Sequence, residues 1–169
     1  QKGTLMKKQP TPWELGATLY MPATRKDIAE VVLEGKIPGL RSLVVCLEDA
    51  VSEHDIPLAI QNLSLFLKRL RHARAVNDDE KYPLVFIRPR NPDMGRWLTA
   101  NLDLSAVDGF VLPKFTRSTL PVWWDIMDGT SLMMMPTLET EEVYDVIKMQ
   151  ALANELSSHD CRDRIIALR

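Results

Sequence analysis

The sequence has few cysteines, no excess of basic charge and no long hydrophobic run. Cys46 and Cys161 are far apart and belong to no CxxC or Cys/His cluster, which argues against a disulfide scaffold and a zinc site. A formal net charge of −2 argues against a nucleic-acid partner. No apolar stretch approaches the roughly 20 residues that span a bilayer. We therefore expect a cytoplasmic protein with two free thiols and no membrane partner.

The ends of the domain follow from composition. Residues 1–12 are polar, contain two prolines and lack the apolar core of a signal peptide, so we expect a flexible lead-in there. The remainder, 13–169, has the composition of one globular domain: 46% of the whole chain is hydrophobic and 26% is charged.

Short apolar runs alternate with helical patterns along this domain. Strands are predicted over 17–21, 42–47, 84–87, 109–112, 131–135 and 164–168. Helices are predicted over 25–34, capped by Thr24, and over 54–75, 93–101, 119–127 and 140–156. The last of these is predicted to be amphipathic, with acidic residues in its first turn.

The apolar runs do not alternate with polar residues, which is typical of parallel strands covered on both faces. Strand–helix alternation of this kind gives either a doubly wound sheet or a TIM barrel. No GxGxxG or P-loop motif follows any predicted strand, which makes a nucleotide-binding sheet less favoured. Periodicity alone leaves both architectures open.

Charged residues follow most of the predicted strands, at the edge where α/β folds bind ligands. In chain order they are Arg25, Glu48, Asp49, Arg88, Lys114 and Glu139. Acidic side chains there can hold Mg²⁺, and arginine binds a carboxylate with two parallel hydrogen bonds. Each residue also has a simpler interpretation, such as helix capping for the acids or an ordinary loop position for Arg88. The prediction of a functional site therefore depends on five predicted strand ends all carrying charged residues, and not on any single residue.

Five segments carry a family resemblance. They are LYMPATR (19–25), LEDAV (47–51), FIRPRN (86–91), DGFVLPK (108–114) and PTLET (136–140). In this order and spacing they resemble the HpcH/HpaI aldolase and citrate lyase β-subunit family, which includes malyl-CoA lyase and a C–C bond lyase branch. The resemblance implies a (β/α)₈ TIM barrel of which this chain supplies about the first six strands.

The resemblance also implies roles for individual residues. Glu139 would be a Mg²⁺ ligand, and Glu48 and Asp49 would order metal-bound water as catalytic acidic residues. Arg88 would bind the substrate carboxylate or oxo group and act in catalysis. Arg25 would lie near an acyl-thioester carrier, usually coenzyme A. Lys114 would line the mouth of the barrel beside the other site residues.

Three features depart from the family pattern. Cys46 replaces the first Asp of the DLEDAV signature, and Ala23 replaces the glycine of the PGNR segment. The second metal-binding Asp of the family is expected after the sixth strand, beyond Arg169. These departures favour the C–C bond lyase branch.

The implied activity is Mg²⁺-dependent aldol or Claisen-type cleavage or condensation of a 2-oxo or 2-hydroxy acid, or of its acyl-CoA thioester. The metal would act as Lewis acid and template, while Arg88 offsets charge on oxygen. A homo-oligomer, trimer or hexamer, is expected. Two alternatives remain open: an enzyme that handles pyruvate or phosphoenolpyruvate, and a degenerate, non-catalytic barrel that binds a partner or metabolite.

Overall fold

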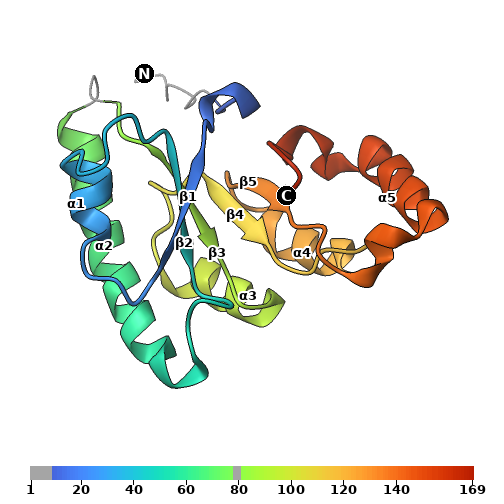
Figure 1. The fold of residues 1–169 in the computed structure, drawn as a ribbon, viewed down its shortest axis with the longest axis horizontal. Coiled ribbons are helices and arrows are strands. Elements are labelled where there is room, and N and C mark those ends of the chain that lie inside the picture. The colour runs from blue at the N-terminus through green and yellow to red at the C-terminus, as the bar shows by residue number, and fades with distance from the viewer. Residues whose placement is uncertain (1–8, 78–80) are drawn as a thin grey trace.

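The computed structural model describes residues 9–77 and 81–169. Strands and helices alternate along the chain, with short 3₁₀ helices (η) between them (Figure 1). The strands are β1 (Thr18–Pro22), β2 (Ser42–Cys46), β3 (Leu84–Arg88), β4 (Gly109–Leu112) and β5 (Met133–Pro136). The helices are α1 (Ile28–Leu33), α2 (Ile56–Val76), α3 (Pro92–Asn101), α4 (Leu120–Met127) and α5 (Val146–Ser158). The 3₁₀ helices are η1 (Pro12–Glu14), η2 (Glu53–Asp55), η3 (Glu141–Tyr144) and η4 (Asp160–Arg164).

The sheet has the strand order of a barrel. Its strands are all parallel and follow one another in space as they do in the chain, β1-β2-β3-β4-β5. A doubly wound sheet would reverse direction at a switch point, where strands distant in sequence become neighbours. Sequential order in a parallel sheet instead progresses around a barrel, so the predicted TIM-barrel class is confirmed for this segment.

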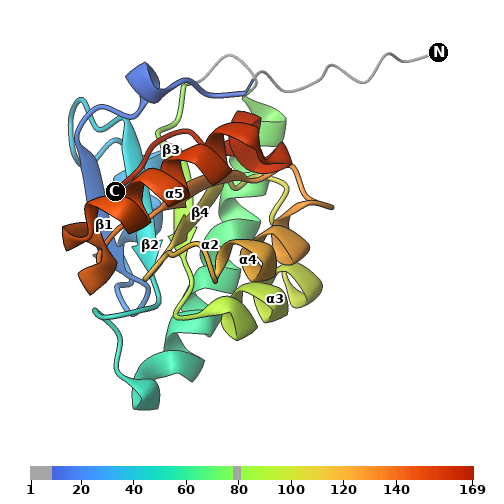
Figure 2. The same cartoon turned by 90° about the vertical axis from the view of Figure 1, so that its right-hand side faces the viewer.

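The two faces of the sheet have different coverings. The larger core cluster packs strand residues such as Val45 and Ile87 against side chains from all five α-helices. The smaller cluster contains Leu15, Val44, Phe86, Val111, Met133, Met135 and Ile166, which come from strands and from segments that flank them. Figure 2 shows α2, α3 and α4 on one side of the sheet. We call the larger one the outer cluster and the smaller one the inner cluster. Helices outside and packed side chains inside are the layers of a TIM barrel.

The sixth predicted strand is only partly formed. Residues 165–169 approach β5, but the regular ladder is reduced to one parallel bridge between Met134 and Ile165. Hydrogen bonds continue from the Ile166 and Arg169 amides to the carbonyls of Met134 and Pro136, 3.0 and 2.9 Å long. The prediction of six strands is therefore wrong for the described residues, where five strands are followed by a strand-like segment.

Two predicted helices begin elsewhere than expected. The segment predicted as one helix over 140–156 divides into η3 and α5 at Asp145, whose carboxylate accepts hydrogen bonds from the Ile147 and Lys148 amides. This N-cap satisfies backbone donors that a continuous helix would have bonded internally. The expected acidic first turn consequently lies in η3. α1 also begins later and is shorter than predicted: its N-cap position is Asp27 and not Thr24, and the Asp27 side chain makes no capping hydrogen bond.

Part of the predicted lead-in over 1–12 lies outside the described residues, which begin at residue 9. Leu15, which follows η1, packs in the inner cluster. Ser42 at the start of β2 donates a hydrogen bond to the Leu15 carbonyl, 2.5 Å away. Within the described ranges, no helix combines the length and apolarity needed to cross a membrane.

Gly109 allows β4 and β5 to approach closely, and its replacement should be destabilising. A Cβ atom there would lie 2.4 Å from the Met133 carbonyl oxygen and 3.0 Å from Phe86 Cδ1. Because the oxygen belongs to the neighbouring strand, relief requires the β4–β5 ladder to open. We expect Gly109→Ala to lower the free energy of unfolding by about 2 kcal/mol, as overpacking does. Urea denaturation measures this loss. Gly129→Ala is the matched control, since a Cβ there meets nothing within 4 Å; an equal loss in both variants would contradict the prediction.

Candidate active site

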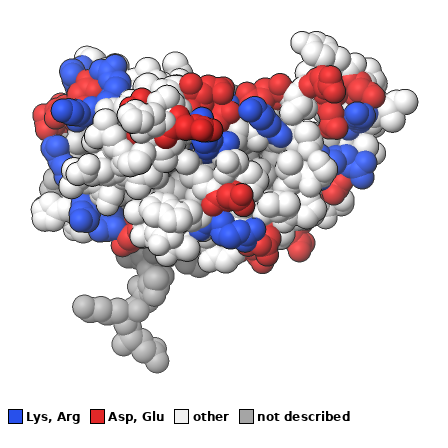
Figure 3. All heavy atoms as spheres, turned by 90° about the horizontal axis from the view of Figure 1, so that it is seen from below, with Lys and Arg blue, Asp and Glu red and all other residues white. Residues whose placement is uncertain are grey.

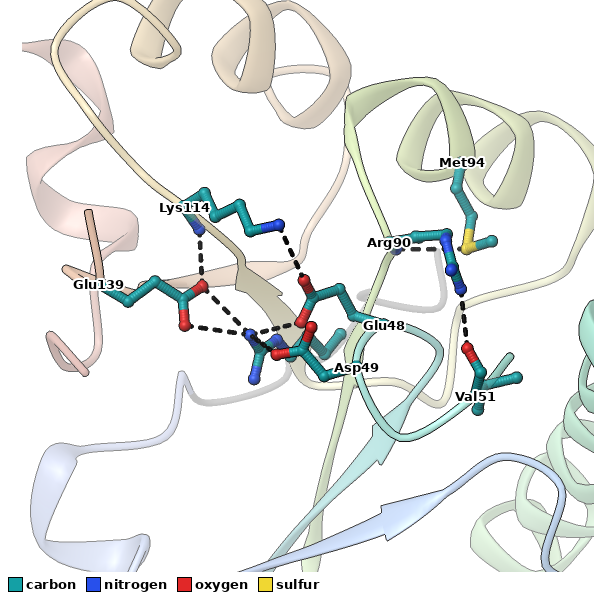
Figure 4. Close-up of polar contacts among 8 residues, drawn as sticks. Glu48, Asp49, Val51, Arg90, Met94, Lys114 and Glu139 are labelled. Carbon is teal, nitrogen blue, oxygen red and sulfur yellow. Dashed lines mark hydrogen bonds and ion pairs between the residues drawn. The ribbon is translucent and has the colours of Figure 1, made fainter. Parts of the chain in front are cut away.

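Five of the predicted site residues meet at the carboxyl ends of the strands. Arg88 is the last residue of β3, Glu48 and Asp49 follow β2, Lys114 follows β4, and Glu139 follows β5. Each apolar strand is buried, so its polar side chain is presented as the strand reaches the edge of the barrel. Figure 4 shows the carboxylates of Glu48, Asp49 and Glu139 turned toward one point, with Lys114 above them. We call these five residues, Glu48, Asp49, Arg88, Lys114 and Glu139, the Arg88 cluster.

The guanidinium of Arg88 joins the three carboxylates. Its Nη2 lies 2.6 Å from Glu48 Oε2 and 3.6 Å from Asp49 Oδ2. The same nitrogen donates to both carboxylate oxygens of Glu139, at 3.1 and 3.2 Å. One cation therefore connects side chains from β2, β3 and β5, with three formal negative charges around it.

The cluster has a buried base and an open rim. The side chains of Glu48 and Arg88 are 4% and 11% exposed, whereas those of Asp49 and Lys114 are 74% and 70% exposed. Burying a charge is costly unless it is paired, so Glu48 and Arg88 depend on each other. The exposed members can contact a molecule that enters from solvent.

Lys114 combines two roles at the rim. Its backbone has a φ of 49°, in the left-handed region that non-glycine residues seldom adopt. In this conformation its amide donates to Glu139 Oε1 at 2.8 Å, and its ammonium lies 3.6 Å from Glu48 Oε1. Backbone strain of this kind is concentrated at functional sites, where it fixes polar groups in place. Here it fixes the carboxylate of Glu139.

Arg25 is placed apart from the Arg88 cluster. Its guanidinium is about half exposed and binds Asp27 through two hydrogen bonds, 2.8 and 2.6 Å long. Arg25 and Lys36 together hold the pKa of the Asp27 carboxyl far below its usual range, and Asp27 raises the pKa of Arg25 in turn. The structure thus pairs Arg25 with a local carboxylate, and its predicted role beside an acyl-thioester carrier stays a prediction.

Sequence comparison identifies the family of this chain. Residues 9–169 match a family described as C–C bond lyase of the TIM-barrel fold. The chain belongs to this family. Comparison with curated proteins finds no match. The lyase therefore has a barrel whose strand ends carry the Arg88 cluster, at the edge where TIM-barrel enzymes place their active sites.

Two further residues at this edge of the lyase were not identified from the sequence. Arg90 donates to the Val51 carbonyl oxygen at 2.8 Å and thereby ties the β3–α3 connection to the loop after β2 (Figure 4). Thr137 follows β5 and has a buried hydroxyl. Nothing in the sequence singles out Thr137, although it continues the alternation of Met133 and Met135 toward Glu139.

The surface around the mouth has mixed charge. Figure 3, which views the molecule from below Figure 1, shows acidic and basic side chains interspersed over the face toward which the strands run. Mixed charge produces no extended field of one sign, so steering of a large polyanion is not favoured. The local Arg88 cluster, and not the overall charge, is the feature suited to recognising a small ligand.

The acidic residues fit a magnesium ion only in part. Within residues 9–77 and 81–169, no group of three or more His, Cys, Asp or Glu side chains is spaced to hold a metal. Mg²⁺, however, usually takes one or two protein carboxylates and fills its remaining positions with water and substrate oxygens. The carboxylates of Glu139 and Glu48 are both ion-paired to the same nitrogen of Arg88, which already supplies a positive charge between them.

Proposed function

We propose that the lyase is a Mg²⁺-dependent enzyme of the citrate lyase β-subunit type. Its substrate is a small 2-hydroxy or 2-oxo acid, free or as the coenzyme A thioester. The observation that carries this proposal is the Arg88 cluster: a buried arginine and three carboxylates at the catalytic edge of a barrel in a C–C bond lyase family.

Arg88 is suited to bind the carboxylate of such an acid. A guanidinium stays charged at any working pH and presents a planar fork to two oxygens. In cleavage, the substrate hydroxyl loses its proton as the carbon–oxygen bond becomes a carbonyl. The adjacent carbon–carbon bond breaks, and its electron pair passes to the other fragment as an enolate, which then takes up a proton. Arg88 and Lys114 offset the negative charge that develops on oxygen.

Glu48 is suited to accept the hydroxyl proton. Its Oε2 is buried and, among the described atoms, has no hydrogen-bond donor in line, although Arg88 Nη2 lies 2.6 Å away. A carboxylate oxygen has two lone pairs, so Glu48 Oε2 can face Arg88 and still receive a proton from a ligand. Asp49, exposed beside it, would orient water at the mouth.

Glu139 would hold the magnesium ion, with Glu48 beside it. When bound, the ion would polarise a substrate oxygen and help to orient the acid. The Lys114 amide and Arg88 fix the Glu139 carboxylate from two sides. This fixed orientation supports Glu139 as a ligand.

Product analysis tests the reaction class. The complete protein is incubated with Mg²⁺ and, separately, with malyl-CoA, with mixtures of acyl-CoA with glyoxylate or oxaloacetate, and with phosphoenolpyruvate. We expect cleavage products from malyl-CoA and condensation products from the mixtures of acyl-CoA with glyoxylate or oxaloacetate, identified by mass spectrometry. Turnover of phosphoenolpyruvate alone would contradict the proposal.

Removing the Glu139 carboxylate tests the metal. We expect Glu139→Gln in the complete protein to weaken Mg²⁺ binding at least ~10-fold, because one anionic oxygen ligand becomes a neutral amide. Isothermal titration calorimetry measures the affinity. Glu142→Gln is the control, since Glu142 lies in η3 and its ion pair is with Lys148, 3.7 Å away. Unchanged affinity in Glu139→Gln would exclude Glu139 as a ligand.

A further inference from the structure

Buried polar atoms without a hydrogen-bond partner gather at the mouth of the barrel. Over the described part of the chain, the side-chain atoms of this kind are Glu48 Oε2, Arg88 Nε, Thr137 Oγ1 and Trp123 Nε1. Trp123 belongs to α4 and packs in the outer cluster. The other three follow or end strands β2, β3 and β5 at the same edge. An unpaired buried polar group is costly, so Arg88 Nε and Thr137 Oγ1 indicate that a ligand completes their hydrogen bonds. Glu48 Oε2 lies 2.6 Å from Arg88 Nη2 in an ion pair, and its remaining lone pair can accept from the same ligand.

The position of Thr137 follows from the alternation of β5. Met133 and Met135 pack in the inner cluster, whereas Met134 and Leu138 pack in the outer one. The ladder continues past β5, because the Thr137 amide donates to the Leu112 carbonyl at 2.9 Å and its own carbonyl accepts from Phe115 at 3.0 Å. By this alternation Thr137 faces the inside of the barrel, as Met135 does before it and Glu139 after it.

The three atoms have complementary hydrogen-bonding capacity. Arg88 Nε is a donor only, Glu48 Oε2 as a carboxylate is an acceptor only, and a threonine hydroxyl can donate. Two donors match the two oxygens of a carboxylate, and the acceptor matches a hydroxyl. A 2-hydroxy acid carries both groups on adjacent carbons, whereas a 2-oxo acid offers no hydrogen to Glu48.

We propose that Thr137 is a further substrate-binding residue, whose hydroxyl forms with Arg88 Nε and Glu48 Oε2 the binding site for the 2-hydroxy-carboxylate end of the substrate. This inference rests on the proposed function and narrows it, from 2-oxo or 2-hydroxy acids to 2-hydroxy acids. Thr137 and Arg88 Nε donate to the carboxylate, and Glu48 accepts from the hydroxyl.

Two variants of the complete protein separate binding from folding. Thr137→Val keeps the shape of the side chain and removes the hydroxyl, and Thr137→Ser keeps the hydroxyl. The probes are malate and succinate, which share both carboxylates and differ by the 2-hydroxyl group. Calorimetry in the presence of Mg²⁺ measures their affinities, and thermal unfolding without ligand measures stability.

We expect the unaltered protein to bind malate about 10-fold more tightly than succinate, because only malate donates to Glu48. Thr137→Val should weaken both ligands about 10-fold, and Thr137→Ser should restore most of that loss. The unfolding midpoint of Thr137→Val should stay unchanged or rise, since no internal hydrogen bond is lost.

Three results would overturn the inference. Unchanged malate affinity in Thr137→Val would show that Thr137 does not bind the substrate, and a lowered unfolding midpoint would give its hydroxyl a structural role. Equal affinity for malate and succinate would remove the preference for 2-hydroxy acids. Carbon–carbon cleavage products from the complete protein would still support the proposed function in each case, whereas failure to bind either acid would count against both.

Discussion

Replacing Arg88 by lysine should lower kcat/KM by about 10²-fold, which corresponds to roughly 3 kcal/mol of transition-state stabilisation. Lysine keeps the positive charge but loses the planar fork that binds a carboxylate through two parallel hydrogen bonds. In Arg88 a single nitrogen, Nη2, contacts Glu48 and both oxygens of Glu139. A lysine ammonium in that place would have no second nitrogen left for the substrate. Substrate and carboxylates would then be held less accurately at the moment of bond cleavage.

Steady-state kinetics on the acid identified by product analysis measures this loss, with circular dichroism to verify the fold. Arg90→Lys is the matched control, two residues further along the chain. Arg90 donates to a backbone carbonyl, that of Val51, and a lysine ammonium can still reach such an acceptor. If Arg90→Lys loses more activity than Arg88→Lys, the substrate anchor has been assigned to the wrong arginine.

The strands could be predicted from the sequence because their pattern is local. Parallel strands covered on both faces are continuous apolar runs, and β2 and β4 are buried at every position. The predicted bounds of β4 agree with the structure. The choice between a barrel and a doubly wound sheet was not local, since strand order depends on contacts between distant segments. The family resemblance favoured the barrel, and the sequential strand order confirmed it.

The approach of Glu48, Asp49, Arg88, Lys114 and Glu139 followed from one rule, that parallel strands end at a common edge. The rule places residues at an edge but does not decide which side chains pair. Arg25 obeys it and is nevertheless bound by Asp27, two residues away. The division at Asp145 was missed for a related reason: a capping carboxylate inside an amphipathic pattern ended the expected helix early.

Thr137 shows why the site was incomplete at the level of sequence. A threonine in a strand is ordinary, and its hydroxyl becomes informative only when it is buried without a partner. The backbone around Thr137 bonds to the end of β4 and to Arg169, so its surroundings depend on segments distant in the sequence. The site residues that could be predicted were the charged residues at strand ends. Thr137 is uncharged, and only the packed structure reveals that its hydroxyl is buried without a partner.

The Arg88–Glu48 pair should also stabilise the fold, and Arg88→Met should lower the free energy of unfolding by about 3 kcal/mol. The substitution keeps most of the side-chain volume but leaves Glu48, which is 4% exposed, without its nearest cation. Removing one partner of a buried ion pair leaves an uncompensated charge, which is costlier than losing the pair as a whole. Arg88→Lys should lose much less stability, because it retains a cation. Activity and stability are therefore affected differently by the two variants.

A double-mutant cycle with Glu48→Gln tests this explanation by urea denaturation. If the loss in Arg88→Met comes from the unpaired carboxylate, adding Glu48→Gln should recover at least about half of it, since the buried charge is then removed. Arg96→Met is the control for ion pairs in general. Arg96 lies 2.8 Å from Asp125, but both side chains are more than half exposed, so that pair should contribute at most about 1 kcal/mol. Additive losses in the double variant would mean that Arg88 stabilises the barrel through packing of its stem, and that its charge serves the ligand alone.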